Sequence, residues 1–450
     1  MSTGFPRILP VLAAVLAVHV LVGSVGYAFQ SQRSLEGRGP FLTGLLGAPA
    51  EAEAKFQDNL WANVPSLILC IVVASVSPAT GVGGGSFFVA VFATIMRWSV
   101  PPAVALSQAT MAASALAGAI ANSLMPHPDD SSRPVVDYSL GLVLSPGMLM
   151  GSSIGVILNA VMPSWLVSFT LTIVLGYVAY NASFKAASLV KEEQQEGKDE
   201  GSSGQDESAE PGGHGNGPEE PLLSKQKVSS FWSNYKGLIG MIAFWAVYMA
   251  LEVHKREDKR CTKQYGIVTA VQVAVGIVVL VLSTIWISRE QQPSSDHQGT
   301  GQGAWTLSSY AKIAVVTLFG GLLAGLLGMG GGFIIAPLML HLGIHPSVAT
   351  STSNTVLFFS TSFAALAYER MDLLNYQFAA IFAGTCLISG AAGAAGISKL
   401  VEKLGRPSIL VVLMAGIATL ATVLTGISKG GKGVQDLING HNIGFKPFCQ

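Results

Sequence analysis

The chain has 450 residues, of which 50% are apolar and only 12% are charged, and its mean hydropathy is +0.50. Apolar runs of about 20 residues, the length that crosses a bilayer core, recur along it, so the sequence predicts an all-α, polytopic membrane protein. The 26 basic and 26 acidic residues balance, which argues against nucleic acid as a partner, and the four cysteines have neither zinc-site nor disulfide-framework spacing.

The first hydrophobic segment, residues 8–28, has two interpretations. It follows one basic residue, Arg7, and ends in small residues that suit a cleavage site, as in a signal peptide. Its 21-residue apolar run also has the length of a first membrane helix. Residues 29–60 are polar and mixed, so we treat residues 1–60 as one unit, a hydrophobic segment followed by an extramembrane stretch.

Two sets of five apolar segments follow, in residues 61–189 and 310–428. The first set lies at about 61–81, 86–97, 102–125, 138–160 and 164–188. The second set lies at about 310–328, 333–343, 347–368, 375–398 and 407–428. In both sets the second segment is too short to cross a hydrocarbon core of about 30 Å, so we predict broken or re-entrant helices shielded by their neighbours. Five crossing elements per half would make this an internal repeat of inverted orientation.

The region between the halves predicts a linker and an inserted hairpin. Residues 190–236 are rich in Gly, Ser and Glu, which indicates a disordered acidic linker. Residues 237–288 contain two apolar helices, 237–251 and 266–288, around a basic loop. That loop favours the cytosol by the positive-inside rule, whereas a cleaved N-terminal signal would contradict this placement, so the absolute orientation stays open. The remaining units are a linker at 289–309 and a C-terminal tail at 429–450.

Matched glycine clusters stand between the first and second segments of each half. The sequence reads GVGGG at residues 81–85 and GMGGG at residues 328–332, an offset of 247. Glycine can adopt left-handed backbone angles and expose N–H groups to a cavity, and the helix that follows begins with unpaired N–H donors. Such a break predicts an anion site without a cationic side chain, and close helix packing is the alternative. The candidate residues are Gly83, Gly84, Gly85, Gly330, Gly331 and Gly332.

Small polar residues follow a proline in each half. Pro102 and Pro346 suit the first turn of a helix, because the N–H that proline lacks has no partner there. The polar residues are Ser107, Gln108 and Thr110 in the first half and Ser351, Thr352, Ser353 and Asn354 in the second. Their neutral groups suit an oxyanion within a membrane, and hydrogen bonding between helices is the alternative. Aligning the prolines pairs Ser107 with Ser351.

Ionisable residues are nearly absent from the two repeat cores. Arg97 and the pair Glu369-Arg370 lie at segment ends, where charged side chains usually reach the interface. His341 and His345 are candidates for proton coupling, with an ordinary loop histidine as the alternative. Enzyme motifs such as HExxH and GxSxG are missing, and a P-loop-like GISKGGK run lacks the residue that binds magnesium, so no catalytic site, cofactor or metal is expected.

The two motifs resemble the sulfite exporter TauE/SafE family of membrane transporters. The matching stretches are GVGGGSFFVAVF with PPAVALSQ, and GMGGGFIIAPLMLHLGIHPSVATSTSN. The long middle insertion and the hydrophobic N-terminus resemble the plant-type branch of that family. The resemblance implies secondary transport of sulfite or small organosulfur anions such as sulfonates. Whether a proton or a sodium ion is coupled to it, the sequence does not tell.

The sequence therefore predicts a multi-pass integral membrane protein that transports small sulfur oxyanions. The anion would be held by the glycine breaks and by Ser, Thr and Asn side chains at the repeat interface, and one half would rock against the other. The rival hypothesis is a membrane receptor or scaffold that does not transport and uses its acidic linker to recruit partners. The sequence does not identify the membrane.

Overall fold

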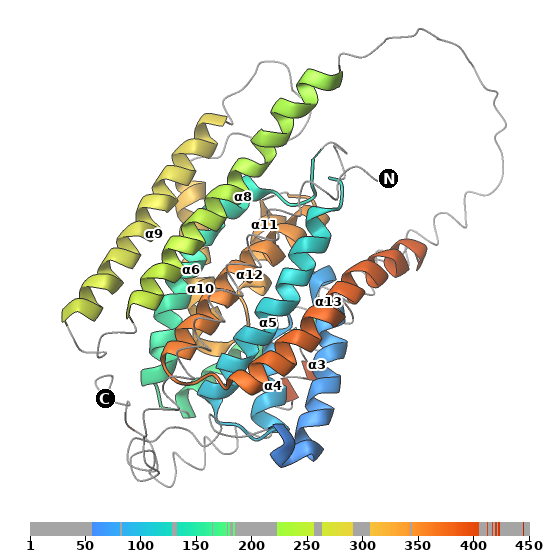
Figure 1. The fold of residues 1–450 in the computed structure, drawn as a ribbon, viewed down its shortest axis with the longest axis vertical. Coiled ribbons are helices and arrows are strands. Elements are labelled where there is room, and N and C mark those ends of the chain that lie inside the picture. Colours follow the sequence, from blue (N-terminus) through green and yellow to red (C-terminus); the bar gives the residue numbers. More distant parts are fainter. Residues whose placement is uncertain are drawn as a thin grey trace, which may run out of the picture.

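The computed structural model describes residues 56–127, 133–177, 223–255, 263–290 and 307–404, apart from a few single positions, and isolated residues beyond them. The named elements in these ranges are all helices. They form an elongated bundle with α9 at one edge and α3 and α13 at the other (Figure 1). The hydrophobic segment 8–28, the segment 407–428, the C-terminal tail and most of both linkers lie outside the described residues.

Helix bounds in the two halves follow the predicted apolar segments closely. The first half contains η2 (Phe56–Asn59), α3 (Leu60–Thr80), α4 (Gly85–Thr94), α5 (Val100–Ser123) and α6 (Tyr138–Val161), followed by a shorter apolar helix at Trp165–Tyr177. The second half contains α10 (Leu307–Leu327), α11 (Gly332–His341), α12 (Pro346–Arg370) and α13 (Tyr376–Leu404). The two short helices, α4 and α11, have ten residues each, as their segments predict.

The inserted hairpin consists of α8 (Leu223–His254) and α9 (Lys263–Glu290). α8 begins well before the predicted segment at 237–251, so the prediction of a disordered linker is wrong for its last part, residues 223–236. Val228, Phe231 and Trp232 have the three- and four-residue spacing of an apolar helix face. The composition of the linker as a whole hid this local pattern.

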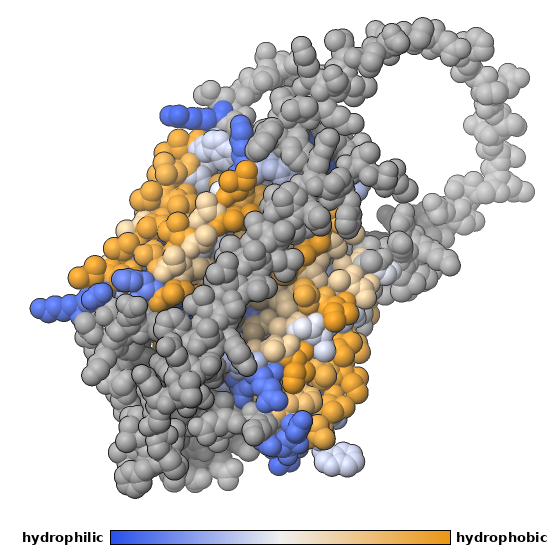
Figure 2. Space-filling model, in the orientation of Figure 1, coloured by the Kyte–Doolittle hydropathy of each residue, from blue (hydrophilic) through white to orange (hydrophobic). Residues whose placement is uncertain are grey.

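Seven helices among the described residues are long and apolar enough to cross a membrane. α12 is 25 residues long but rich in serine and threonine, and nearly all of its residues from 348 to 368 are buried. Its polar sequence is tolerated because neighbouring helices shield it. Apolar side chains cover the outer side of α9, with hydrophilic residues at its two ends (Figure 2). The protein is an integral, multi-pass membrane protein.

The first helix of each half packs against the fourth element of the other half. α10 lies along α6, where a Cβ on Gly151 or Gly321 would collide with the facing backbone. α3 lies along α13, where a Cβ on Gly393 would collide with the backbone of Ser75. Small residues let membrane helices approach this closely. The two halves are therefore interlocked.

Two groups of helices result from this exchange. α5 packs on α13 and on α3, which defines the α13 group of α3, α5 and α13. α12 packs on α6 and on α10, which defines the α6 group of α6, α10 and α12. Each group contains two helices of one half and one of the other. The groups meet where α5 contacts α12, and this contact carries the candidate site.

Candidate substrate site at the paired glycine breaks

Left-handed glycines interrupt the chain after α3 and after α10. Gly81, Gly83 and Gly84 have φ of 68°, 85° and 65°. In the second half Gly328 and Gly330 have φ of 69° and 72°. Residues with a Cβ rarely adopt these angles, so the predicted left-handed backbone is confirmed in both clusters.

At position 331 glycine is required by lack of space rather than by backbone angle. Its φ of −78° is helical, so its backbone would accept any residue. A Cβ here would instead collide with the terminal methyl group of Met148. Gly85 and Gly332 are the first residues of α4 and α11. The two clusters therefore share their left-handed turns but differ at the last residue before the short helix.

Both breaks present backbone donors without partners. In the described part of the chain, no backbone hydrogen bond is donated by the N–H groups of Gly83, Gly84, Gly85, Gly330, Gly331 and Gly332. These donors lie at the N-terminal ends of α4 and α11, where the helix dipole adds partial positive charge. The breaks also touch, because a Cβ on Gly85 would lie 2.5 Å from the carbonyl oxygen of Gly328. Both sets of donors therefore belong to one region.

Ser107 joins the two breaks through its hydroxyl group. The Oγ atom lies 3.1 Å from the carbonyl oxygen of Gly85 and 2.9 Å from that of Gly328. One hydrogen is therefore shared between a carbonyl of the first half and a carbonyl of the second. In this conformation the Ser107 hydroxyl links the two halves by hydrogen bonding. Hydrogen bonding between helices is the alternative to contact with an oxyanion.

Ser353 makes the corresponding contacts in the second half. Its Oγ lies 3.0 Å from the carbonyl oxygen of Gly81 and 3.4 Å from that of Gly332. These two glycines stand 247 residues from the glycines that Ser107 contacts, so the contacts pair Ser107 with Ser353. The proline-based pairing with Ser351 differs by two residues. Ser351 is buried, and its carbonyl oxygen accepts a hydrogen bond from Thr355.

Two buried amide side chains follow the paired serines. Gln108 donates from Nε2 to the carbonyl oxygen of Ala324 at 2.6 Å, and Asn354 donates from Nδ2 to that of Ala115 at 3.3 Å. Their side-chain oxygens are buried and accept no hydrogen bond in the described structure. Each amide thus crosses to a helix of the other half. The sequence signal that pairs Ser107 with Ser353 is that each serine is followed directly by an amide residue, Gln108 or Asn354.

Thr352 connects the site to the loop before α6. Its Oγ1 accepts a hydrogen bond of 2.9 Å from the backbone N–H of Asp137. The Asp137 side chain in turn caps α6 by accepting from the N–H of Leu140 at 2.9 Å. Thr352 therefore fixes the start of α6 against α12. No sequence pattern predicts this contact, because it depends on how the loop before α6 folds back onto α12.

The charged and histidine candidates lie at the ends of helices or just beyond them. Arg97 is exposed, and Arg370 Nε lies 2.9 Å from a carboxylate oxygen of Glu369. His345 is exposed at the start of α12, where Nδ1 accepts from the N–H of Ser347 at 3.3 Å. His341 ends α11. Among the described residues no group of three potential metal ligands occurs.

A family model described as sulfite exporter TauE/SafE matches residues 4–182 and 133–420. The chain belongs to the sulfite exporter TauE/SafE family. The family assignment made from the glycine motifs is thereby confirmed. No solved structure matches the chain.

Relatives from Arabidopsis thaliana that are named as TauE/SafE family proteins match most of this chain. Sulfite exporter TauE/SafE family protein 5 is 28% identical over 399 residues, which cover 85% of this chain and 86% of the relative. Sulfite exporter TauE/SafE family protein 3 is 26% identical over 408 residues, which cover 88% of this chain and 84% of the relative. These plant relatives agree with the plant-type branch, and their names are those of exporters rather than of enzymes.

Proposed function

We propose that this TauE/SafE protein is a secondary transporter of small sulfur oxyanions, such as sulfite or a small organosulfonate, and that the anion binds between the glycine breaks. The main support is that two breaks with unpaired N–H donors touch each other inside a membrane-spanning bundle. Helix N-termini bind anions through such donors. In membrane transporters, discontinuous helices commonly hold the substrate near the midplane.

Neutral donors suit this task inside a membrane. A permanently charged Arg or Lys at the centre would carry a large desolvation cost between transport cycles. Backbone N–H groups, hydroxyls and amides attract an anion without bringing a full charge into the bilayer. The candidate side chains at the α5–α12 contact, including Ser107 and Ser353, are all uncharged.

An inverted repeat would account for the paired contacts around the site. The serine contacts recur at the same relative positions, and α4 and α11 lie toward opposite ends of the bundle in the view of Figure 1. Alternating access would then move the α13 group against the α6 group. The interlocking of the halves makes this division more favourable than rocking of one half against the other, because it keeps the contacts of α6 with α10 and of α13 with α3 and α5 and changes mainly that of α5 with α12.

Uptake of labelled sulfite into liposomes tests the proposed function. Purified full-length protein should give saturable uptake that depends on either a proton or a sodium gradient and that small sulfonates inhibit, while protein-free liposomes set the background. Sulfate and chloride serve as comparison anions. Absence of anion flux from correctly inserted, folded protein would overturn the proposal and favour the receptor or scaffold hypothesis.

A further inference from the structure

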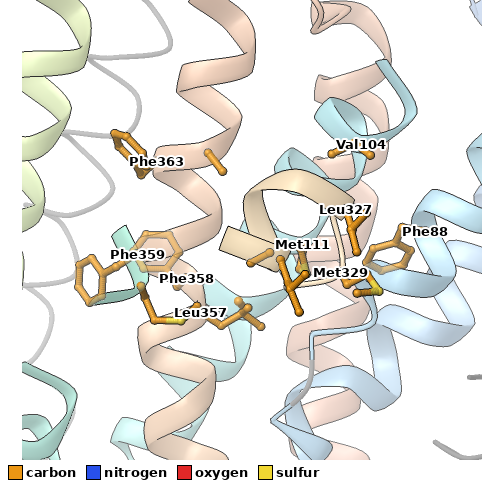
Figure 3. Close-up of a cluster of buried hydrophobic side chains, with 14 of the residues drawn as sticks. Phe88, Val104, Met111, Leu327, Met329, Leu357, Phe358, Phe359 and Phe363 are labelled. Atoms are coloured by element: carbon orange, nitrogen blue, oxygen red, sulfur yellow. The ribbon is translucent and has the colours of Figure 1, made fainter. Parts of the chain in front are cut away.

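Two apolar side chains fill the space between the glycine breaks. Met111 of α5 and Leu357 of α12 are both fully buried. A Cβ on Gly330 would lie 2.6 Å from Sδ of Met111 and 2.9 Å from Cδ1 of Leu357. A Cβ on Gly83 would lie 3.1 Å from Sδ of Met111 and would collide with Leu357. Each side chain therefore touches both breaks, and Figure 3 shows them next to each other beside Met329.

The two residues occupy equivalent positions on their helices. Met111 comes four residues after Ser107, and Leu357 comes four residues after Ser353. Residues four apart lie on the same helix face, one turn along. The serine that joins the breaks and the apolar side chain that fills the gap therefore form one repeated unit. They stand at the contact between the α13 group and the α6 group.

This arrangement covers polar backbone with hydrocarbon. The N–H groups of Gly83 and Gly330 are unpaired in the described structure, and Met111 and Leu357 pack against these residues. A buried N–H without a partner carries a substantial desolvation cost. An oxyanion cannot occupy the gap between the breaks while both side chains remain in it. The conformation is therefore closed at its centre.

We propose that Met111 and Leu357 form an apolar gate that withdraws to admit the anion and, by its bulk, sets the size of anion that passes. The proposal rests on the proposed transport function for the identity of the ligand, but the movement of the gate is independent of it. Methionine is unbranched and has three rotatable bonds, so Met111 can leave the gap by a rotamer change. Leu357 is stiffer and would move with α12.

Thiol labelling tests whether the gate opens. Met111→Cys and Leu357→Cys are made separately in the full chain after its four cysteines are replaced by alanine. Reconstituted protein is treated with a membrane-impermeant maleimide without any sulfite, which would react with the reagent. Met249→Cys is the matched control, because Met249 is 3% exposed in α8 and far from the breaks in sequence. We expect both gate positions to label at least tenfold faster than the control.

Substitutions that change bulk test the size filter. Met111→Ala should raise the flux of benzenesulfonate relative to sulfite several-fold. Met111→Leu keeps a similar volume but branches the side chain, so it should slow sulfite flux several-fold while leaving Tm nearly unchanged. Met249→Ala should lower Tm without changing the ratio of the two fluxes.

The outcomes separate the gate from the transport function. Labelling of folded gate variants no faster than the Met249→Cys control would overturn the gate, even if sulfite is transported. Labelling without anion flux would support an opening gate and refute the proposed substrate. An unchanged flux ratio in Met111→Ala would refute the size filter. If one cysteine variant fails to fold, the labelling rate at the other position decides.

Discussion

The serine hydroxyls at the glycine breaks already donate hydrogen bonds to backbone carbonyl oxygens. Ser107 and Ser353 each direct a hydroxyl toward two backbone carbonyl oxygens, one from each half. An anion that accepts a hydrogen bond from either serine must therefore replace a carbonyl as the acceptor. This exchange would loosen the connection between the breaks at the same moment as the substrate binds. Substrate binding and conformational change would then be coupled at a single atom.

Alanine substitution tests whether Ser107 and Ser353, rather than Ser351, contact the bound anion. Ser107→Ala and Ser353→Ala should weaken sulfite binding about 10- to 150-fold, because a hydrogen bond to a charged group is worth about 1.5 to 3 kcal/mol. Ser351→Ala is the control, since Ser351 lies on the same helix as Ser353 and is also buried. Binding affinity and ligand-induced thermal shift should be measured on purified protein. The double variant should be non-additive if both serines meet one ligand; equal losses in all three single variants would refute the pairing by contacts.

Glycine substitutions should have unequal effects in the two breaks. Gly84 has φ of 65°, and a Cβ there would lie 2.8 Å from Cγ1 of Val73, so Gly84→Val should cost about 1 to 3 kcal/mol in backbone strain alone. Gly331→Ala requires only that the end of the Met148 side chain move. A Cβ on Gly384 meets no atom within 4 Å, which makes Gly384→Ala the control. Sulfite flux per folded molecule should fall most for Gly84→Val and least for Gly384→Ala, and the reverse order would contradict the backbone site.

Helices were the predictable elements of this fold. Bilayer thickness sets their length, and glycine and proline mark their ends, so each signal is local in sequence. The partners of these helices were not predictable, because α3 with α13 and α10 with α6 pair across hundreds of residues. The pairing of serines by the prolines differs from the pairing by contacts for a specific reason. α5 begins at Val100 and α12 at Pro346, so the helix starts are 246 residues apart, whereas aligning the prolines assumes 244.

The sequence also predicted the left-handed glycines but not what covers them. A GxGGG pattern requires backbone freedom, and that requirement is local. The side chains of Met111 and Leu357 reach the breaks only because α5 and α12 cross there. Their apolar character looked like ordinary helix core in the sequence. Their proposed role as a gate depends on the crossing of the two helices, which the sequence does not predict.

A buried polar cluster ties α8 to α9 in the inserted hairpin. Lys255 donates to Glu252 at 3.0 Å, and Gln272 of α9 donates to the same carboxylate oxygen at 3.1 Å. Lys255 and Glu252 are 4% and 5% exposed. Both charges are therefore almost fully removed from water. Such pairs are sensitive to the loss of one partner, because the other charge is then buried without compensation.

Removal of the lysine should destabilise the hairpin. Lys255→Met leaves the Glu252 carboxylate with only Gln272, and we expect a loss of about 3 to 5 kcal/mol. Lys263→Met is the control, because Lys263 is exposed at the start of α9. Adding Glu252→Gln to Lys255→Met should recover most of the stability. Thermal unfolding in detergent measures all three variants; a double variant no more stable than Lys255→Met would show that the lysine acts by packing rather than by charge.

The close packing between helices of different halves would restrict how parts of the molecule can move. Helices of the α13 group are held together by close packing, including Gly393 against α3, and the α6 group by the glycine-lined contact of α6 with α10. Separating α3 from α13 would expose these surfaces, whereas sliding the two groups past each other would change mainly the contact of α5 with α12, which carries the candidate site. Motion between the groups would therefore act directly on the proposed site.

Cross-linking of native cysteines tests this division. Cys386 Sγ on α13 lies 3.8 Å from the carbonyl oxygen of Cys70 on α3, so both thiols belong to the α13 group. Joining them with dibromobimane, whose thioether bonds resist sulfite, should leave sulfite flux within about a factor of two, because the two helices move as one body.

A second cross-link spans the two groups. Ala115→Cys on α5 with Asn354→Cys on α12, made with Cys70 and Cys386 replaced, should lose most of its remaining flux on cross-linking, and the same variant before treatment serves as its own control. Mass spectrometry of the cross-linked peptides measures the extent of each reaction. Loss of flux on joining Cys70 to Cys386 would mean that α3 and α13 separate during transport and that the moving bodies are the sequence halves.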